Sequence, residues 1–164
     1  MALLLISESI FFFMLILAFV YFPSDKVRIA TSNLNLTLTT FYTVCLVASS
    51  FTAMRAARNP GTRSWLAATI VLGCVFFFGQ GAEYLRLIHD GFGIGQNLFG
   101  TTFLTLAGIH ALHVIAGIVL LGGVLWTAAP ERKARTAGSV AMYWHFIDGV
   151  WIAIFSVVYL GAFL

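Results

Sequence analysis

Residues 98–126 read LFGTTFLTLAGIHALHVIAGIVLLGGVLW, a run without Asp, Glu, Lys or Arg. A helix rising 1.5 Å per residue needs about 20 apolar residues to cross roughly 30 Å of hydrocarbon. This run therefore predicts a transmembrane helix. The whole chain has 164 residues, of which 60% are hydrophobic and 9% charged, with a mean hydropathy of +0.97. A water-soluble domain has about 25% charged residues, so the composition indicates that much of the surface faces lipid.

Five runs of this kind predict an all-α membrane protein, a five-transmembrane-helix bundle in a single domain. We expect the helices near residues 2–22, 36–57, 64–88, 98–126 and 139–163. The first run begins close to Met1 as a signal peptide would, but it has no basic n-region and contains Glu8, so we expect the helix to be retained. Aromatic residues that favour the headgroup zone fall near predicted helix ends: Tyr21, Trp65, Trp126 and Trp144.

Basic residues are unevenly distributed among the connections. They gather in the second and fourth connections: Arg55, Arg58, Arg63, Arg132, Lys133 and Arg135. The positive-inside rule then places the N-terminus in the cytoplasm and the C-terminus outside. The same residues, above all those at 55, 58, 63, 132 and 133, are candidates for contact with lipid headgroups. Two short juxtamembrane groups of this kind do not indicate a nucleic-acid partner.

Several ionisable residues fall inside the predicted helices: Glu8, Glu83, His110, His113, His145 and Asp148. A charged group at mid-membrane costs roughly 2.5 to 3.5 kcal/mol on insertion scales, so such residues are functional candidates. His145 and Asp148 are three residues apart and share a helix face, which favours an internal pair. Glu8 and His145 each lie about 9 Å along their predicted helices, so they could meet. Glu83 lies near the outer end of its helix, where we expect partial solvation.

One face of the fourth predicted helix carries small, aromatic and histidine side chains: Phe103, Ala107, His110, His113 and Gly117. The helical period places these residues together, and we expect them to face the bundle interior. A haem or metal site would need donors from facing helices at matched depth. Because His110 and His113 share one helix and His145 enters from the opposite side, interhelical hydrogen bonds are favoured over ligation. For Glu8, a proton- or lipid-related role and a structural role remain equally open.

Four motifs follow one another in a characteristic order. Residues 143–151 read YWHFIDGVW, which resembles the final-helix signature of subunit III of the haem-copper terminal oxidases, YWHF(V/I)DxVW. Residues 99–103 (FGTTF) and 108–114 (GIHALHV) resemble the YGSTFF and GFHGLHV run of that family, at its spacing from the last motif. Residues 81–84 (GAEY) and 7–13 (SESIFFF) resemble its QxxEY and SExxFF segments. The resemblance covers nearly the whole chain.

The resemblance implies a short, five-helix subunit III in the bacterial cytoplasmic (inner) membrane. Such a chain is not catalytic alone and binds no haem or copper, which lie in partner subunits of an oxygen-reducing cytochrome c or quinol oxidase. Members of the family pack on subunit I and assemble with subunit II and other oxidase subunits. They hold phospholipid in a cleft and support proton uptake and the stability of the complex. Its carbodiimide-reactive carboxylate falls on Glu8. The first two helices of the longer members are missing, which leaves one wall of that cleft unassigned.

Two alternatives remain open at this stage. A subunit III homologue associated with nitric oxide reductases has the same fold and a similar length. A proton-coupled transporter using Glu8, Glu83 and Asp148 belongs to another class. Transporters usually show internal repeats or helices broken at mid-membrane, and the sequence shows neither.

Overall fold

The computed structural model describes residues 2–21, 35–59, 63–95, 98–126 and 130–160. Its helices are α1 (Ala2–Tyr21), α3 (Leu36–Arg58), α4 (Arg63–His89), α5 (Leu98–Trp126) and α6 (Pro130–Phe155), with a π-helical continuation of α6, η1 (Ser156–Leu160). Five helices in this part of the chain are long and apolar enough to cross a membrane. The predicted fold class and helix count are therefore confirmed.

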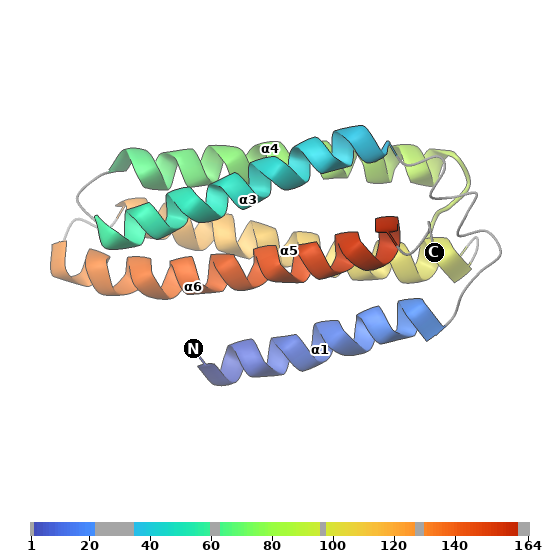
Figure 1. Cartoon of the computed structure of the whole chain (residues 1–164), viewed down its shortest axis with the longest axis horizontal. Coiled ribbons are helices and arrows are strands. Elements are labelled where there is room, and N and C mark those ends of the chain that lie inside the picture. The colour runs from blue at the N-terminus through green and yellow to red at the C-terminus, as the bar shows by residue number, and fades with distance from the viewer. Residues whose placement is uncertain (1, 22–34, 60–62, 96–97, 127–129, 161–164) are drawn as a thin grey trace.

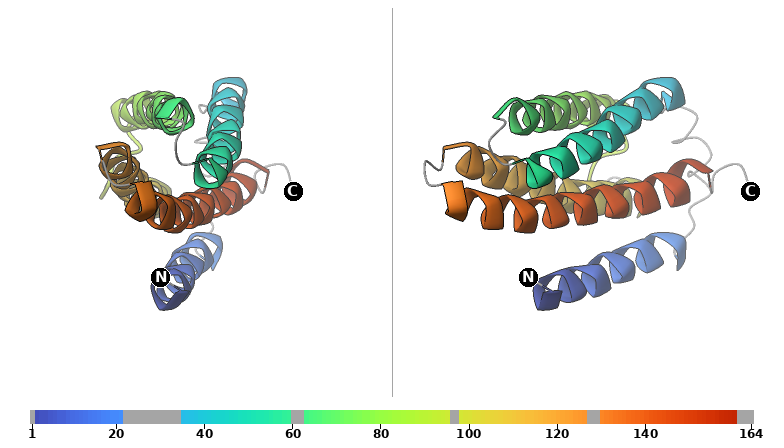
Figure 2. Two further views of the ribbon diagram at one scale, coloured as in Figure 1. Left: turned by 90° about the vertical axis from the view of Figure 1, so that its left-hand side faces the viewer. Right: turned by 60° about the vertical axis from the view of Figure 1, so that its left-hand side comes forward.

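The helices form a ring with one helix outside it. α3 packs on α4 and α6, and α5 packs on α4 and α6, so these helices close into a ring, as the end-on view in Figure 2 shows. α1 lies outside this ring against α5 and α6. It begins in the half of the bundle in which α6 begins and runs toward the end at which η1 lies (Figure 1).

The start of α6 differs from the prediction. The helix begins at Pro130 instead of near residue 139, and its membrane-spanning part runs from Thr136 to Tyr159. Proline is tolerated in the first turn of a helix, and the Lys, Arg and Ala residues that follow are good helix formers. A run of apolar residues shows only the part of a helix that lies in the hydrocarbon. It therefore could not reveal that α6 extends further, through the charged residues that precede Thr136. The ends of α1, α3, α4 and α5 lie within one residue of the prediction. The last helix was expected to end near residue 163; α6 ends at Phe155 and η1 at Leu160, and residues 161–164 lie outside the described part of the chain.

Trp144 is the centre of the core. Its side chain is fully buried, and it packs over the backbones of α4 and α5 at two glycines. A Cβ built on Gly73 would lie 2.8 Å from this indole, and one built on Gly117 would lie 2.7 Å from it. The prediction that Trp144 lies in the headgroup zone was therefore wrong, because the early start of α6 places it well inside the helix. Trp126, by contrast, is 90% exposed at the end of α5.

The predicted inward face of α5 is largely confirmed. Phe103, Ala107, His110 and Gly117 are buried. His113 is half-buried, because it lies at the edge of that face and turns toward α1.

The connection from α4 to α5 depends on glycine at two points. Gly91 has a φ of +86° where α4 ends, and the next backbone N–H, that of Phe92, donates to the Leu87 carbonyl at 3.0 Å. Only a residue without a Cβ adopts this left-handed conformation freely. Gly100, in the first turn of α5, packs so closely on the Phe92 carbonyl that a Cβ there would collide with it. This explains the glycine in the FGTTF motif.

We expect Gly117→Ala to destabilise the bundle. The new methyl group would press on the Trp144 ring, and overpacking costs about 1–3 kcal/mol, more than the about 1 kcal/mol that Ala gains over Gly in a helix. Gly108→Ala in the same helix is the control, since its Cβ would meet nothing within 4 Å. Thermal unfolding in detergent measures both. Equal melting temperatures for the two variants would contradict this packing.

Candidate functional site

Glu8 of α1 and His113 of α5 form a hydrogen-bonded pair at the edge of the bundle. His113 Nε2 lies 3.1 Å from Glu8 Oε2, and His113 Nδ1 lies 2.8 Å from the Ile109 carbonyl oxygen. The carbonyl can only accept, so Nδ1 carries a proton and donates it. A second proton is then shared between Nε2 and the carboxyl group, as either an imidazolium with a carboxylate or two neutral groups. Both states have no net charge, which makes the pair tolerable in hydrocarbon.

The expected contact between Glu8 and His145 was wrong. The depth argument assumed that the first and last helices start at the same level, but α1 begins further along the bundle than α6 does (Figure 1). Glu8 therefore meets His113 of α5 instead. The histidine had been identified as a candidate, but a single sequence does not show which helices are neighbours.

Ser50 of α3 joins the two ionisable side chains of α6. Its hydroxyl lies 2.9 Å from His145 Nδ1 and also donates to Asp148 Oδ2. The expected internal pair of His145 and Asp148 is thus bridged by a serine instead of being direct. Asp148 is only 4% exposed, and its Oδ1 has no hydrogen-bond partner, whereas His145 is exposed on the outer flank of α6.

Other α3 hydroxyls contact aromatic side chains from the C-terminal part of the chain, and sequence reasoning missed them. Trp144 Nε1 donates to Ser49 Oγ (2.8 Å), Trp151 Nε1 donates to Thr43 Oγ1 (3.0 Å), and the Thr39 hydroxyl donates to the Tyr159 hydroxyl (3.5 Å). We call these contacts, together with the Ser50 bridge, the α3–α6 hydroxyl ladder. The sequence contained a pattern that could have predicted these contacts: the hydroxyl residues at positions 39, 43 and 50 recur at helical spacing, so they share one face of the helix.

Glu83 is buried near the outer end of α4. Its side chain is 4% exposed, its Oε2 accepts a hydrogen bond from the Asn35 backbone N–H at 3.3 Å, and its Oε1 lies 3.6 Å from the Arg86 guanidinium. The expectation of partial solvation was therefore wrong for the carboxylate, whereas Arg86 is 68% exposed. The charge is thus neutralised by a neighbour that reaches outward.

His110 is separate from the Glu8–His113 pair. It is 1% exposed, and its ring stacks on Trp151 with centroids 5.2 Å apart. Phe76 and Phe12 meet the same ring edge-on at 6.2 and 6.4 Å. Within the described residues, no group of three or more His, Cys, Asp or Glu side chains is arranged to hold a metal ion.

Three of the basic candidates, Arg55, Arg58 and Arg63, lie where α3 ends and α4 begins. Arg55 lies over the Trp65 ring, 5.4 Å from its centroid, and the Arg58 guanidinium lies 3.6 Å from the Met54 sulfur. Arg63 is exposed and lines a surface hollow with Leu125 and Trp126. The side chains of Arg132 and Lys133 lie outside the described residues.

The fold and these contacts define a multi-pass helical membrane protein whose helices are linked by internal hydrogen bonds between polar side chains. The model of the family described as cytochrome c oxidase subunit III matches residues 23–162. The chain belongs to this family, as the motifs indicated. The motif residues Trp144, His145, Asp148 and Trp151 are also the ones that bond to α3.

Individual relatives give the same result. A probable cytochrome c oxidase subunit 3 from Nocardia farcinica is 38% identical over 138 residues, which cover 78% of this chain and 68% of the relative. Cytochrome c oxidase subunit 3 from Corynebacterium diphtheriae is 33% identical, covering 94% and 83% of the two chains. The Synechocystis sp. protein with the same description is 35% identical, covering 96% and 72%.

We expect Ser50→Ala to destabilise the protein, because it removes the hydroxyl that pairs with a buried carboxyl group. Leaving such a group unsatisfied costs about 1–3 kcal/mol. Ser9→Ala is the matched control, since the Ser9 hydroxyl bonds only to the Leu5 carbonyl of its own helix on an exposed face. Its change should stay within about 0.5 kcal/mol. Thermal unfolding in detergent checks this, and a Ser50 variant as stable as the Ser9 variant would show that the bridge contributes nothing.

Proposed function

We propose that this chain is a non-catalytic subunit III of a bacterial haem-copper terminal oxidase. It packs on the catalytic subunit I, binds phospholipid, and supports proton uptake and the stability of the complex. Haem and copper lie in the partner subunits, and this chain binds none of them. The observation that carries the proposal is the Glu8–His113 pair, together with membership of the cytochrome c oxidase subunit III family.

The exposure of the Glu8–His113 pair supports the proposed role in proton uptake. Its side chains are 29% and 20% exposed, so the pair reaches the bundle surface between α1 and α5. A shared proton at such a place is stabilised by two groups and still accessible to a neighbouring subunit. A buried structural pair would have no such access.

The exposed surface of α1 supports the proposal that this chain binds phospholipid and packs on another subunit. Large apolar side chains on its outer face are between 49% and 84% exposed: Leu3, Ile6, Ile10, Phe13, Met14, Leu17 and Val20. A helix that shows so much apolar surface within a membrane is covered by acyl chains or by another subunit. The basic residues Arg55, Arg58 and Arg63 lie where α3 ends and α4 begins. This end of the bundle is the one nearer to the start of α1 (Figure 1), which favours a cytoplasmic N-terminus under the positive-inside rule.

The continuity of the helices argues against a transporter. α4 and α5 run without interruption from Arg63 to His89 and from Leu98 to Trp126. Substrate sites of secondary transporters are typically built where helices are broken at mid-membrane.

We expect Glu8→Gln to leave the subunit in the complex but to shorten the working life of the enzyme. The amide keeps the shape and can donate to Nε2 of the neutral imidazole, whereas the shared proton is lost. The subunit content of the purified complex and the number of turnovers before oxygen consumption stops measure the two effects. Ser7→Gln, which places the same amide on the exposed side of α1, is the control. An unchanged number of turnovers would contradict the proton-related role, and loss of the subunit would show that the ion itself is structural.

Membership of an oxidase complex has its own test. The tagged chain, purified from its native membrane in mild detergent, should bring oxidase subunits I and II with it, identified by mass spectrometry, together with a haem spectrum. Copurification of nitric oxide reductase subunits instead would favour the reductase-associated alternative. A stoichiometric haem spectrum from the chain expressed alone would overturn the proposal that it binds no haem.

A further inference from the structure

The imidazole of His145 lies on the outer surface of the bundle, at a depth that lipid headgroups do not reach. It belongs to the exposed flank of α6, next to Ser50 of α3. Along the membrane-spanning part of α6, His145 lies nine residues after Thr136 and fourteen before Tyr159, about 14 and 21 Å from the two ends. Headgroups lie beyond the hydrocarbon at those ends. This imidazole therefore faces either acyl chains or another protein.

The hydrogen bonds of Ser50 determine which nitrogen of His145 carries a proton. The serine hydroxyl has one proton, which it donates to Asp148 Oδ2. The same oxygen lies 2.9 Å from His145 Nδ1, so Nδ1 donates its own proton to the serine oxygen. In the neutral imidazole, Nε2 is then an acceptor without a proton. Among the described residues, His145 makes no other hydrogen bond, so Nε2 has no donor.

An unpaired acceptor at this depth is unfavourable. Acyl chains offer no hydrogen bond, so polar groups within a membrane normally find partners in protein. The imidazole cannot turn Nε2 toward Ser50 without giving up the bond from Nδ1, and the serine is itself held by Asp148, which is 4% exposed. The donor that Nε2 lacks therefore has to come from outside the bundle.

The surface around His145 has the shape that a second helix needs. Met142 and Ile152 lie on the same face of α6 and are 55% and 47% exposed. Gly149, one turn after His145, is exposed, and a Cβ built there would meet nothing within 4 Å. A small residue beside a polar one lets another helix backbone approach closely, as in many helix contacts within membranes. Acyl chains also fit this surface, but only a protein can supply the missing donor.

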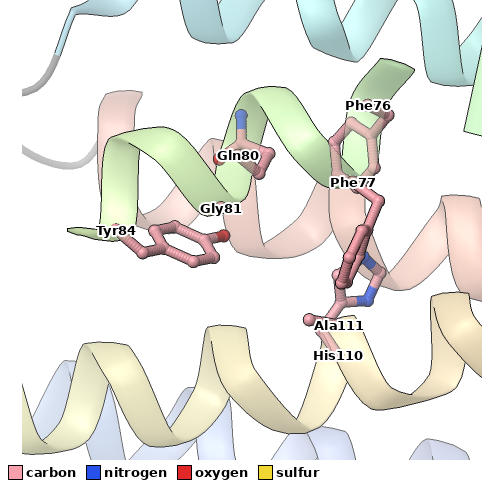
Figure 3. A pocket seen from close by; sticks show the side chains of 7 residues that line it. All are labelled: Phe76, Phe77, Gln80, Gly81, Tyr84, His110 and Ala111. Atoms are coloured by element: carbon pink, nitrogen blue, oxygen red, sulfur yellow. The ribbon is translucent and has the colours of Figure 1, made fainter. Parts of the chain in front are cut away.

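The α4 side of the ring carries no such requirement. A hollow with apolar accessible walls opens between α4 and α5. Figure 3 shows Phe76 and Phe77 beside it and the Gln80 amide pointing away from it. Phe78, the next residue of α4, is 70% exposed. Acyl chains can cover this surface without leaving an accessible polar group unpaired, which makes it a suitable control for the flank of α6.

We propose that the flank of α6 around His145 is the docking site for a transmembrane helix of another subunit, which donates a hydrogen bond to His145 Nε2 from a side chain at mid-membrane depth. The proposal rests on the proposed function only in requiring that the chain belongs to a membrane complex, and it adds the surface and the chemistry of the contact. A second copy of this chain does not fit. A two-fold contact places the same patch of both copies face to face, so two Nε2 acceptors would meet at one depth without a donor.

Site-specific photocrosslinking in the native membrane tests the docking site. A benzoylphenylalanine in place of Met142 samples the flank of α6, and the same group in place of Phe78 is the control on α4. The tagged complex is purified, and the crosslinked peptides are identified by mass spectrometry. We expect position 142 to capture a transmembrane segment of another subunit that contains a side-chain hydrogen-bond donor, and position 78 not to capture it. Crosslinks to lipid alone, to a second copy of this chain, or to the same segment from both positions would overturn the proposal.

The outcomes for this site and for the proposed function can be told apart. If oxidase subunits I and II copurify with the chain while position 142 captures only lipid, the docking site is overturned and the proposed function stands. If position 142 captures a donor-bearing helix of a nitric oxide reductase, the docking site is supported and membership of an oxidase is overturned.

Two substitutions separate the roles of the two nitrogens of His145. His145→Asn keeps an N–H group near the position of Nδ1, which can donate to Ser50, but removes Nε2. We expect an unchanged melting temperature for the isolated chain in detergent, and a dissociation constant from the solubilised complex that rises roughly three- to twentyfold, the range for interhelical hydrogen bonds in membranes.

His145→Gln is the matched variant, because its amide oxygen can take the place of Nε2 while the contact with Ser50 is lost. We expect it to lower the melting temperature of the chain but to bind the complex more tightly than His145→Asn does. Equal dissociation constants for the wild type and His145→Asn would overturn the proposal. The crosslinks from position 142 remain decisive if either variant does not fold.

Discussion

The α3–α6 hydroxyl ladder is the interaction on which the rest of the structure depends. Helices in lipid gain little from hydrophobic association, so close packing and hydrogen bonds must hold them together. Here the indoles of Trp144 and Trp151 each combine a large buried surface with one N–H that finds an α3 hydroxyl. Gly73 and Gly117 give the Trp144 ring its room. The ladder therefore fixes the position of α6, and with it the ring of helices.

Each ionisable residue inside the bundle also needs a partner, and the partners differ. Glu8 shares a proton with a histidine, Asp148 accepts from a serine, and Glu83 combines a backbone N–H with an arginine that reaches outward. Each arrangement neutralises or stabilises a group that lipid would otherwise penalise heavily. The carboxyl group of Glu8 is itself partly exposed, whereas those of Asp148 and Glu83 are buried, which is why the proposed proton-related role falls on the Glu8–His113 pair.

Much of the fold was predictable from the sequence, whereas the pairing of side chains was not. Apolar runs locate membrane crossings reliably because the hydrocarbon thickness sets their length, and the ordered motifs identified the family. The helical extension before Thr136 escaped detection because charged residues form helices as readily as apolar ones. The partner of Glu8 depended on which helices are neighbours and on their relative offset, and neither is encoded in spacing along one helix. The α3 hydroxyls of the ladder were not predicted as contacts, because a hydropathy scale gives Ser and Thr values near zero and so does not mark them as polar groups that need a partner.

The position of α1 outside the ring has a consequence for biogenesis. α1 leaves the ribosome before α5 and α6, the helices against which it packs, because it precedes them in the chain. Glu8 and His113 are 105 positions apart in the chain, so the carboxyl group enters the bilayer long before its imidazole has been synthesised. During that interval Glu8 must stay protonated, remain near the interface or be shielded by the insertion machinery. The helix that carries Glu8 is thus made well before the helices that complete its surroundings.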